Sequence, residues 1–144
     1  MDQKDKKILA LLQQNARMTN VEIARQIDLA PSVTLTRIRK LEEQGVIQGY
    51  EAKLNPLALG LDMLAFVLVK VIGPTDIEGR LINIPGVQEV HNIAGEDCYL
   101  VKVRTRNTEA LSRLLKGNLR EDYISTKTII VLSVLKETNE LMLD

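Results

Sequence analysis

Residues 19–45 read TNVEIARQIDLAPSVTLTRIRKLEEQG. A capping box opens the stretch, because the Thr19 hydroxyl can accept from the amide of Glu22 while the Glu22 carboxylate reaches back. A short helix follows, and after a brief turn Pro31 stands at the first position of another helix, where a missing amide costs nothing. Gly45 ends that helix. The spacing therefore predicts two helices joined by a short turn, the layout of a helix-turn-helix motif.

A further helix of about three turns is predicted before this stretch, ending at Asn15. Apolar residues at helical spacing define the inward faces of all three helices. The residues expected to face the core are Ile8, Leu11, Leu12, Ile23, Ala24, Ile27, Thr34, Ile38 and Leu41. Small three-helix bundles without a role in nucleic-acid binding share this layout, so the layout alone leaves both interpretations open.

The third helix supplies the charge pattern that separates these interpretations. Between Leu29 and Leu41 there are three basic residues and no acidic one. Short hydroxylated or apolar side chains can approach base edges, and Arg and Lys can contact guanine or phosphate. A solvated charged face is the alternative, but the capped helix and the turn favour insertion into a DNA groove. Thr19 and Asn20 are first of all a helix cap, and the free amides beside them could also meet a phosphate. The residues predicted at the DNA interface are Thr19, Asn20, Ser32, Val33, Thr36, Arg37, Arg39 and Lys40.

After Gly45 the apolar pattern changes its period. Strands are predicted over 63–72, 87–92, 98–104 and 126–135, with one helix after a capping box at Thr75 and another capped by Asn107. This βαββαβ order is the ferredoxin-like arrangement, in which helices cover one face of an antiparallel sheet. Because the strands are rich in Val, Leu and Ile on both faces, a second copy of the chain is expected to cover the open face. The predicted fold is thus α+β.

Three segments are predicted along the chain. They are a winged-type helix-turn-helix domain over residues 1–54, a linker over 55–60, and a ferredoxin-like domain for ligand binding and dimerisation over 61–144.

The composition excludes several classes of protein. The chain has 19 Lys and Arg, 19 Asp and Glu, one His and one Cys, too few cysteines for an internal disulfide and too few ligands for a zinc site of nitrogen and sulfur atoms. It lacks a secretory signal and an apolar stretch long enough to span a bilayer, so a cytoplasmic protein without a membrane partner is expected. The net charge of zero conceals a polarity: residues 1–60 hold 9 basic and 7 acidic residues, hence +2, and residues 61–144 hold 10 and 12, hence −2.

Several spaced motifs resemble the Lrp/AsnC family, also called the leucine-responsive regulatory protein or feast/famine family. They are NAR, IA, an arginine followed by LE, and GVI-x-GY in the first half, and IPGVQEV and AGEDCYLVKV in the second. The resemblance implies a transcription regulator whose third helix binds DNA. It also implies dimerisation through the second domain, frequent assembly into octamers, and binding of an amino acid or a similar small molecule, with no other cofactor and no metal.

The resemblance further implies an effector site between neighbouring dimers, near the hairpin loop. It points to Gly95, Glu96 and Asp97 in the loop, with Ser125 and Thr126 as a second wall. Glu96 or Asp97 could accept from an ammonium group, and Gly95 and Ser125 could donate to a carboxylate. The chain departs from the family pattern at Cys98, where relatives often have an acidic residue, and at Ala30 and Thr34.

Two other functions are weighed against this one. Some proteins of the same two-domain build are similar to sirohaem decarboxylases, but such an enzyme should need a cluster of basic and histidine residues, and the second half offers only His91. His91 and Cys98 are interpreted as ordinary strand residues, because no nucleophile stands near His91 in the predicted hairpin. A metabolite-sensing oligomer whose first domain does not bind DNA is the third possibility.

Overall fold

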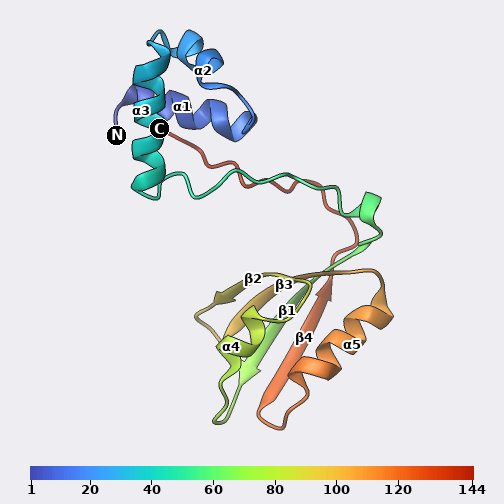
Figure 1. Ribbon diagram of the computed structural model, residues 1–144. Coiled ribbons are helices and arrows are strands. Elements are labelled where there is room, and N and C mark those ends of the chain that lie inside the picture. The colour runs from blue at the N-terminus through green and yellow to red at the C-terminus, as the bar shows by residue number, and fades with distance from the viewer. The chain divides into compact units, whose positions relative to one another are not determined.

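The computed structural model describes residues 1–144, which divide into two compact units (Figure 1). The first unit comprises Met1–Lys53 together with Lys136–Asp144, and the second comprises Leu54–Leu135. This division differs at the C-terminus from the expected second domain, residues 61–144, because the last segment clusters with the first unit. None of the helices has the length and apolar character needed to cross a membrane.

Three helices form the first unit: α1 (Gln3–Gln14), α2 (Asn20–Ile27) and α3 (Pro31–Glu43). The three predicted helices are therefore confirmed. Their core contains the buried residues Ile8, Ile23, Ile27, Ile38 and Leu41, with Leu11 and Leu12 packed against it. Thr34 is also fully buried, and its hydroxyl donates to the carbonyl of Ala30 at 3.1 Å. This bond satisfies the only polar atom that the α3 side chains bring into the core.

The C-terminal segment is anchored to the end of α1. The side-chain amide of Gln13 donates to the carbonyl oxygen of Leu141 at 3.0 Å, and the amide of Leu141 donates to Oε1 of Gln13 at 2.6 Å. One glutamine side chain thus satisfies both main-chain groups of Leu141, as a neighbouring strand would. This pairing, together with a bond from the Lys53 ammonium group to the carbonyl of Glu137, ties the segment to the first unit.

The second unit has the predicted βαββαβ order. Its elements are β1 (Met63–Val71), α4 (Ile77–Ile82), β2 (Val87–Asn92), β3 (Tyr99–Thr105), α5 (Thr108–Leu119) and β4 (Ile124–Ile130), preceded by a short 3-10 helix, η1 (Leu57–Leu59). The strands form one antiparallel sheet in the order β2-β3-β1-β4. Side chains from both helices share one buried cluster with β1 and β3, so the ferredoxin-like prediction is confirmed.

Two local predictions in this unit are wrong. Thr75 does not cap α4; Asp76 occupies the cap position without a side-chain bond, and the Thr75 hydroxyl lies 3.5 Å from a carboxylate oxygen of Glu121. The last strand, predicted over 126–135, instead spans Ile124–Ile130. It pairs with residues Ala65 to Val71 of β1, and β1 itself begins only two residues before Ala65, at Met63. The partner strand, which periodicity does not show, therefore sets its length.

The sheet has a covered face and an uncovered face. Residues opposite one another in the ladder share a face, so Phe66 and Leu68 of β1 lie with Leu100 of β3 and Ile129 of β4 on the side away from the helices. Ile129 is 51% exposed, and Phe66, Leu68 and Leu100 are only partly buried. Aliphatic and aromatic side chains thus remain accessible on this face.

Candidate nucleic-acid interface and effector site

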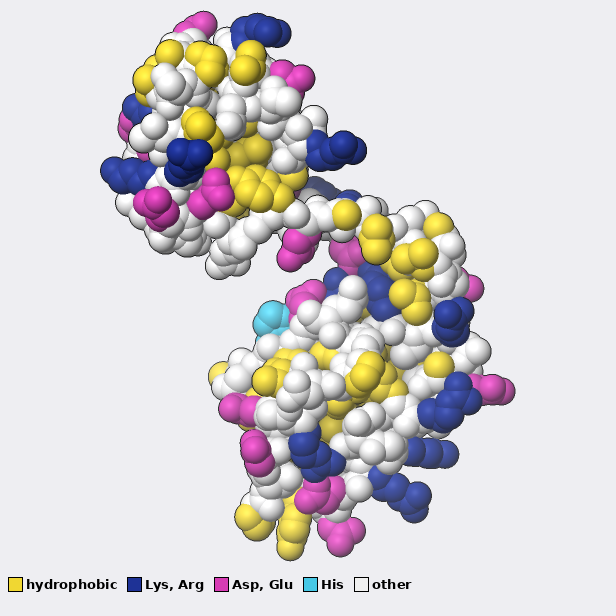
Figure 2. Space-filling model, in the orientation of Figure 1, with side chains coloured by type: hydrophobic (Ala, Val, Ile, Leu, Met, Phe, Trp, Pro, Cys, Tyr) yellow, Lys and Arg dark blue, Asp and Glu magenta, His cyan; other side chains and the backbone are white.

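The outward face of α3 is the candidate nucleic-acid interface. Its core side is marked by the buried residues Thr34, Ile38 and Leu41. Five of the side chains predicted to contact DNA are exposed and project away from that core. They are Ser32, Val33, Thr36, Arg39 and Lys40. Across the face shown in Figure 2, basic and acidic side chains are interspersed on both units. The candidate interface therefore depends on where the cations of α3 stand, because this view shows no patch of a single charge.

Hydrogen bonding within α3 fixes what Thr36 can offer. Its hydroxyl donates to the carbonyl of Ser32 at 3.0 Å. The hydrogen is thereby used, so the lone pairs of the oxygen and the methyl group remain for an external partner. An exposed acceptor beside a methyl group suits the amino group of cytosine or adenine and the methyl group of thymine.

Arg37 is placed differently from the other basic residues of α3. One guanidinium nitrogen, Nη1, lies 2.7 Å from Oδ2 of Asp2 and 3.0 Å from Oδ1 of Asp5, both in the first turn of α1 or at its cap. The amide of Asp5 and the Arg37 guanidinium lower the pKa of Asp2 to about 2, and the two carboxylates raise the pKa of Arg37. These three residues, together with Thr36 and Lys40, line a surface hollow beside α1 and α3. Of the predicted DNA contacts on α3, Arg37 alone has acidic partners in the structure.

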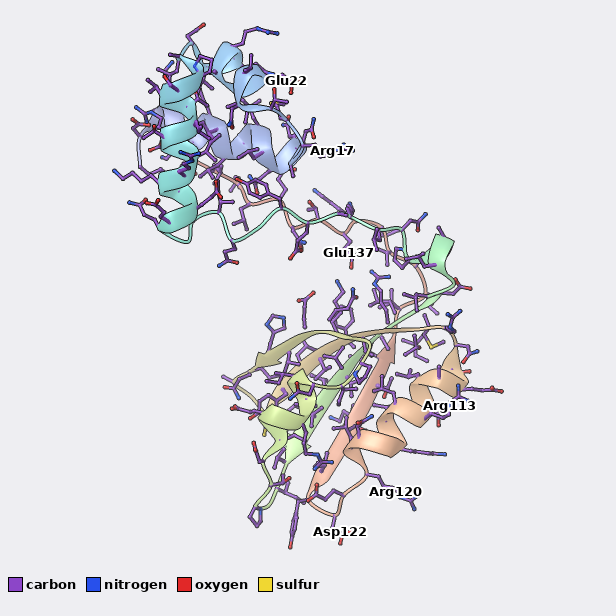
Figure 3. All side chains as sticks on the ribbon, viewed as in Figure 1. Arg17, Glu22, Arg113, Arg120, Asp122 and Glu137 are labelled. Atoms are coloured by element: carbon purple, nitrogen blue, oxygen red, sulfur yellow. The ribbon has the colours of Figure 1, made fainter.

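The capping box at α2 is present as predicted. The amide of Glu22 donates to the Thr19 hydroxyl at 3.2 Å, and the amide of Thr19 donates to Oε2 of Glu22 at 2.8 Å. Thr19 is exposed and Asn20 is partly buried at the first position of the helix. Arg17 lies in the turn before this helix, and Glu22 is on it (Figure 3). Arg17, before the capped helix, and Arg25, in its last turn, are exposed cations outside the predicted set.

The predicted effector residues lie at one end of the sheet. The loop with Gly95, Glu96 and Asp97 joins β2 to β3, and at its end the amide of Cys98 donates to the carbonyl of Val69 in β1 at 2.9 Å. Thr126 of β4 stands opposite this same Val69. The loop and the start of β4 therefore flank the same end of β1.

The structure also separates two of these residues. Thr126 pairs with Val69, on the helix-covered face, whereas Ser125 pairs with Lys70, on the uncovered face. Successive strand residues point to opposite faces. A ligand on one face of the sheet can therefore contact the side chain of Ser125 or that of Thr126, but not both.

His91 and Cys98 have ordinary structural surroundings. Nε2 of His91 lies 2.9 Å from Oε1 of Glu89, and Lys102 reaches the other oxygen of the same carboxylate at 3.2 Å. The hydrogen bond from His91 is the main cause that lowers the pKa of Glu89. Cys98 is a free, partly buried thiol. No group of three or more His, Cys, Asp or Glu side chains is arranged to hold a metal ion.

Comparison with known families accounts for both units. A family of winged helix-turn-helix DNA-binding domains matches residues 1–48, and the Lrp/AsnC ligand binding domain matches residues 64–141. The chain belongs to the Lrp/AsnC family. As a member of this family it combines a DNA-binding domain with a ligand-binding domain, and this is the organisation of a transcriptional regulator.

Named relatives of this Lrp/AsnC protein are transcriptional regulators that align with it over nearly the whole length of both chains. The HTH-type transcriptional regulator FL11 of Pyrococcus furiosus is 39% identical, with 98% of this chain and 95% of the relative covered. The leucine-responsive regulatory protein of Escherichia coli is 34% identical, with 99% and 92% covered. The resemblance stated from the sequence is thus confirmed.

Solved structures of similar proteins include complexes with an amino acid. A transcriptional regulator from Neisseria meningitidis, solved with L-Met, has a TM-score of 0.92 at 30% identity and covers 99% of this chain and 96% of its own. A feast or famine regulatory protein from M. tuberculosis, complexed with L-methionine, has a TM-score of 0.90 at 31% identity and covers 97% of each chain.

Proposed function

We propose that this Lrp/AsnC protein binds double-stranded DNA as a homodimer, with α3 of each subunit in the major groove, and that an amino acid modulates the binding. The observation that carries the proposal is the outward face of α3, where the two cations Arg39 and Lys40 stand beside exposed Ser32, Val33 and Thr36. These side-chain types divide naturally between phosphates and base edges.

The division of labour follows from the position of each side chain. Ser32 and Val33 stand in the first turn of α3, and Thr36 one turn later, so they approach base edges in the usual orientation of a recognition helix. Arg39 and Lys40 lie further along the helix and contact phosphate or guanine. The amides at the start of α2 that the box of Thr19 and Glu22 leaves unbonded, beside Asn20, meet a backbone phosphate.

The uncovered face of the second unit supports the homodimer. Its apolar residues Phe66, Leu68, Leu100 and Ile129 remain accessible in the single chain, and apolar area of this kind is buried by protein partners. A second copy offers the same face, so two copies related by a two-fold axis between their sheets bury both faces at once. Further association of dimers, up to octamers, would use other surfaces.

Selection of DNA by the wild-type chain tests the proposal. From a random double-stranded pool, we expect the full chain to enrich inverted half-sites whose centres are about 10 base pairs, or a multiple of that spacing, apart, because a dimer presents two α3 helices. Affinity for an enriched fragment should fall steeply as salt rises. Enrichment of unpaired half-sites would contradict the dimer, and no enrichment at all would contradict the proposed function.

The hairpin loop carries the effector part of the proposal. Glu96 is exposed and Asp97 partly buried at the end of the sheet where β4 begins, and an ammonium group needs an acceptor of this kind. Complexes of similar regulators with L-methionine support an amino-acid effector of this chain. Such a ligand shifts DNA binding only through different affinities for two states of the protein.

A thermal-shift screen of the amino acids, begun with L-methionine, tests the effector. At about 100 times its dissociation constant, a ligand that binds only the folded chain adds about 2.7 kcal/mol to the free energy of unfolding, so we expect the melting temperature to rise by several degrees. The variant with Glu96→Gln and Asp97→Asn should lose this rise, whereas Glu109→Gln, an exposed acid on α5, should keep it. A rise that survives in the loop variant would contradict the role of the loop.

A further inference from the structure

We infer that Arg37 is a positioning residue, which clamps the recognition helix α3 to the first turn of α1 through Asp2 and Asp5 and makes no contact with DNA. The inference rests on the proposed function, since it concerns how α3 is held for binding. It revises the prediction that all three cations of α3 contact the nucleic acid.

The helical position of Arg37 separates it from the other two cations. It follows buried Thr34 by three residues and precedes buried Leu41 by four, so it lies along the edge of the stripe that packs into the core. Arg39 and Lys40 do not share this spacing and are exposed, whereas Arg37 is partly buried. Helical geometry thus directs Arg37 along the protein surface toward α1.

The carboxylates that meet Arg37 are themselves fixed by the backbone. The amide of Asp5 donates to Oδ1 of Asp2 at 2.9 Å, and the amide of Asp2 donates to Oδ2 of Asp5 at 3.1 Å, which closes a capping box at the start of α1. Nη1 of Arg37 contacts both oxygens of Asp2, at 2.9 and 2.7 Å, and the remaining Oδ1 of Asp5 at 3.0 Å. Because both acids are already oriented by the helix that they cap, holding Arg37 requires little further ordering.

The first turn of α1 also reaches the other helix of the motif. The ammonium group of Lys4 donates to the carbonyl oxygen of Ile27, at the end of α2. One turn of α1 is therefore bonded to α2 through Lys4 and to α3 through Asp2 and Asp5. These two ties set the angle at which the helix-turn-helix motif presents α3.

The same acids make Arg37 a poor contact for DNA. A phosphate within reach of Nη1 would approach Asp2 and Asp5 as well, and like charges brought together at an interface oppose binding. Arg39 and Lys40 have no acidic side chain in ion-pair range in the structure. Arg39 and Lys40 therefore carry the positive charge of α3 that can bind DNA.

Salt dependence separates a positioning role from a phosphate contact. A lost phosphate contact makes the negative slope of log affinity against log salt shallower by about 0.9, whereas a displaced helix loses base contacts without that change. For full-length Arg37→Gln on a fragment selected by the wild type, we expect affinity to fall about tenfold, the cost of one good base contact, with the slope unchanged. Lys40→Gln is the matched variant and should make the slope shallower.

Removal of the acids gives the opposite sign under the two roles. If Arg37 positions α3, the variant with Asp2→Asn and Asp5→Asn should bind the selected fragment more weakly, although it gains positive charge, and adding Arg37→Gln should cost nothing further. Glu43→Gln together with Glu51→Gln, two exposed acids of the first unit, removes the same two charges and should not weaken binding. Arg37→Lys, which keeps one cationic donor, should recover part of the affinity, and the variant without the two acids carries the test if Arg37→Gln does not fold.

Three results would overturn the inference: a slope shallower by about 0.9 in the Arg37 variant, tighter binding after removal of the acids, or unchanged affinity in both. Each of these requires that the wild type binds DNA and that Lys40→Gln weakens it. A wild-type chain that binds no fragment would overturn the proposed function, and this inference with it, and is distinguished by that first measurement.

Discussion

Replacing Arg39 and Lys40 together by alanine is expected to weaken DNA binding about 30-fold at about 0.15 M salt, because each lost phosphate contact removes the release of nearly one counterion. The negative slope of log affinity against log salt should become shallower by about 1.8. Both side chains are exposed on α3, so the change should alter the free energy of unfolding by less than about 0.5 kcal/mol. Titration of a selected fragment at several salt concentrations measures both quantities.

The matched control removes the same charge from the second unit. Arg113 and Arg120 are exposed cations at α5 and just beyond its end (Figure 3). Their double replacement by alanine lowers the net charge by the same two units, yet the slope should stay at the wild-type value. Equal losses of slope in the two double variants would show that net charge, and not the outward face of α3, governs binding.

The second large effect concerns the stability of the second unit. Leu81 on α4 is fully buried in the cluster between the helices and the sheet, whereas its neighbour Ile82 is 66% exposed. Leu81→Ala removes buried methyl groups and leaves a cavity, so we expect the free energy of unfolding to fall by about 3 kcal/mol. Ile82→Ala, the matched control on the same helix, should change it by less than about 0.5 kcal/mol.

Hydrogen exchange followed by peptide assigns this loss to one unit. In Leu81→Ala, amides of β1 and β3 should exchange faster, because their protection depends on the cooperative unfolding of the unit that contains Leu81. Amides of α1, α2 and α3 belong to the other compact unit and should keep the wild-type rate. Faster exchange throughout the chain would contradict the division into two units.

Local patterns were sufficient for most of the fold. The box formed by Thr19 and Glu22 and the cap at Asn107 involve residues three apart in the sequence, so the pattern itself contains both partners. The same logic failed at Thr75, whose hydroxyl lies near Glu121, 46 residues away. Helix α4 has Asp76 at its cap position, one residue later than the pattern assigns. A capping pattern therefore predicts a bond only where packing lets the helix begin at the assigned residue.

The sequence predicted which face of the third helix forms the candidate site, but not the role of each residue on it. Composition placed three cations on the third helix, and periodicity placed Thr34, Ile38 and Leu41 against the core. No local pattern connects Arg37 with Asp2, 35 residues earlier, because their contact arises only when α1 packs across α3. The sequence alone therefore treated as equivalent three cations that the fold makes unlike.

The sequence by itself determined the helix-turn-helix motif, the βαββαβ order and the family, since caps, periodicity and spaced motifs are properties of neighbouring residues. Only the tertiary structure decided that Arg37 is held by α1, that Ser125 and Thr126 face opposite sides of the sheet, and that Leu141 returns to Gln13. Each of these depends on a partner far along the chain, and such partners meet only when the helices and strands pack.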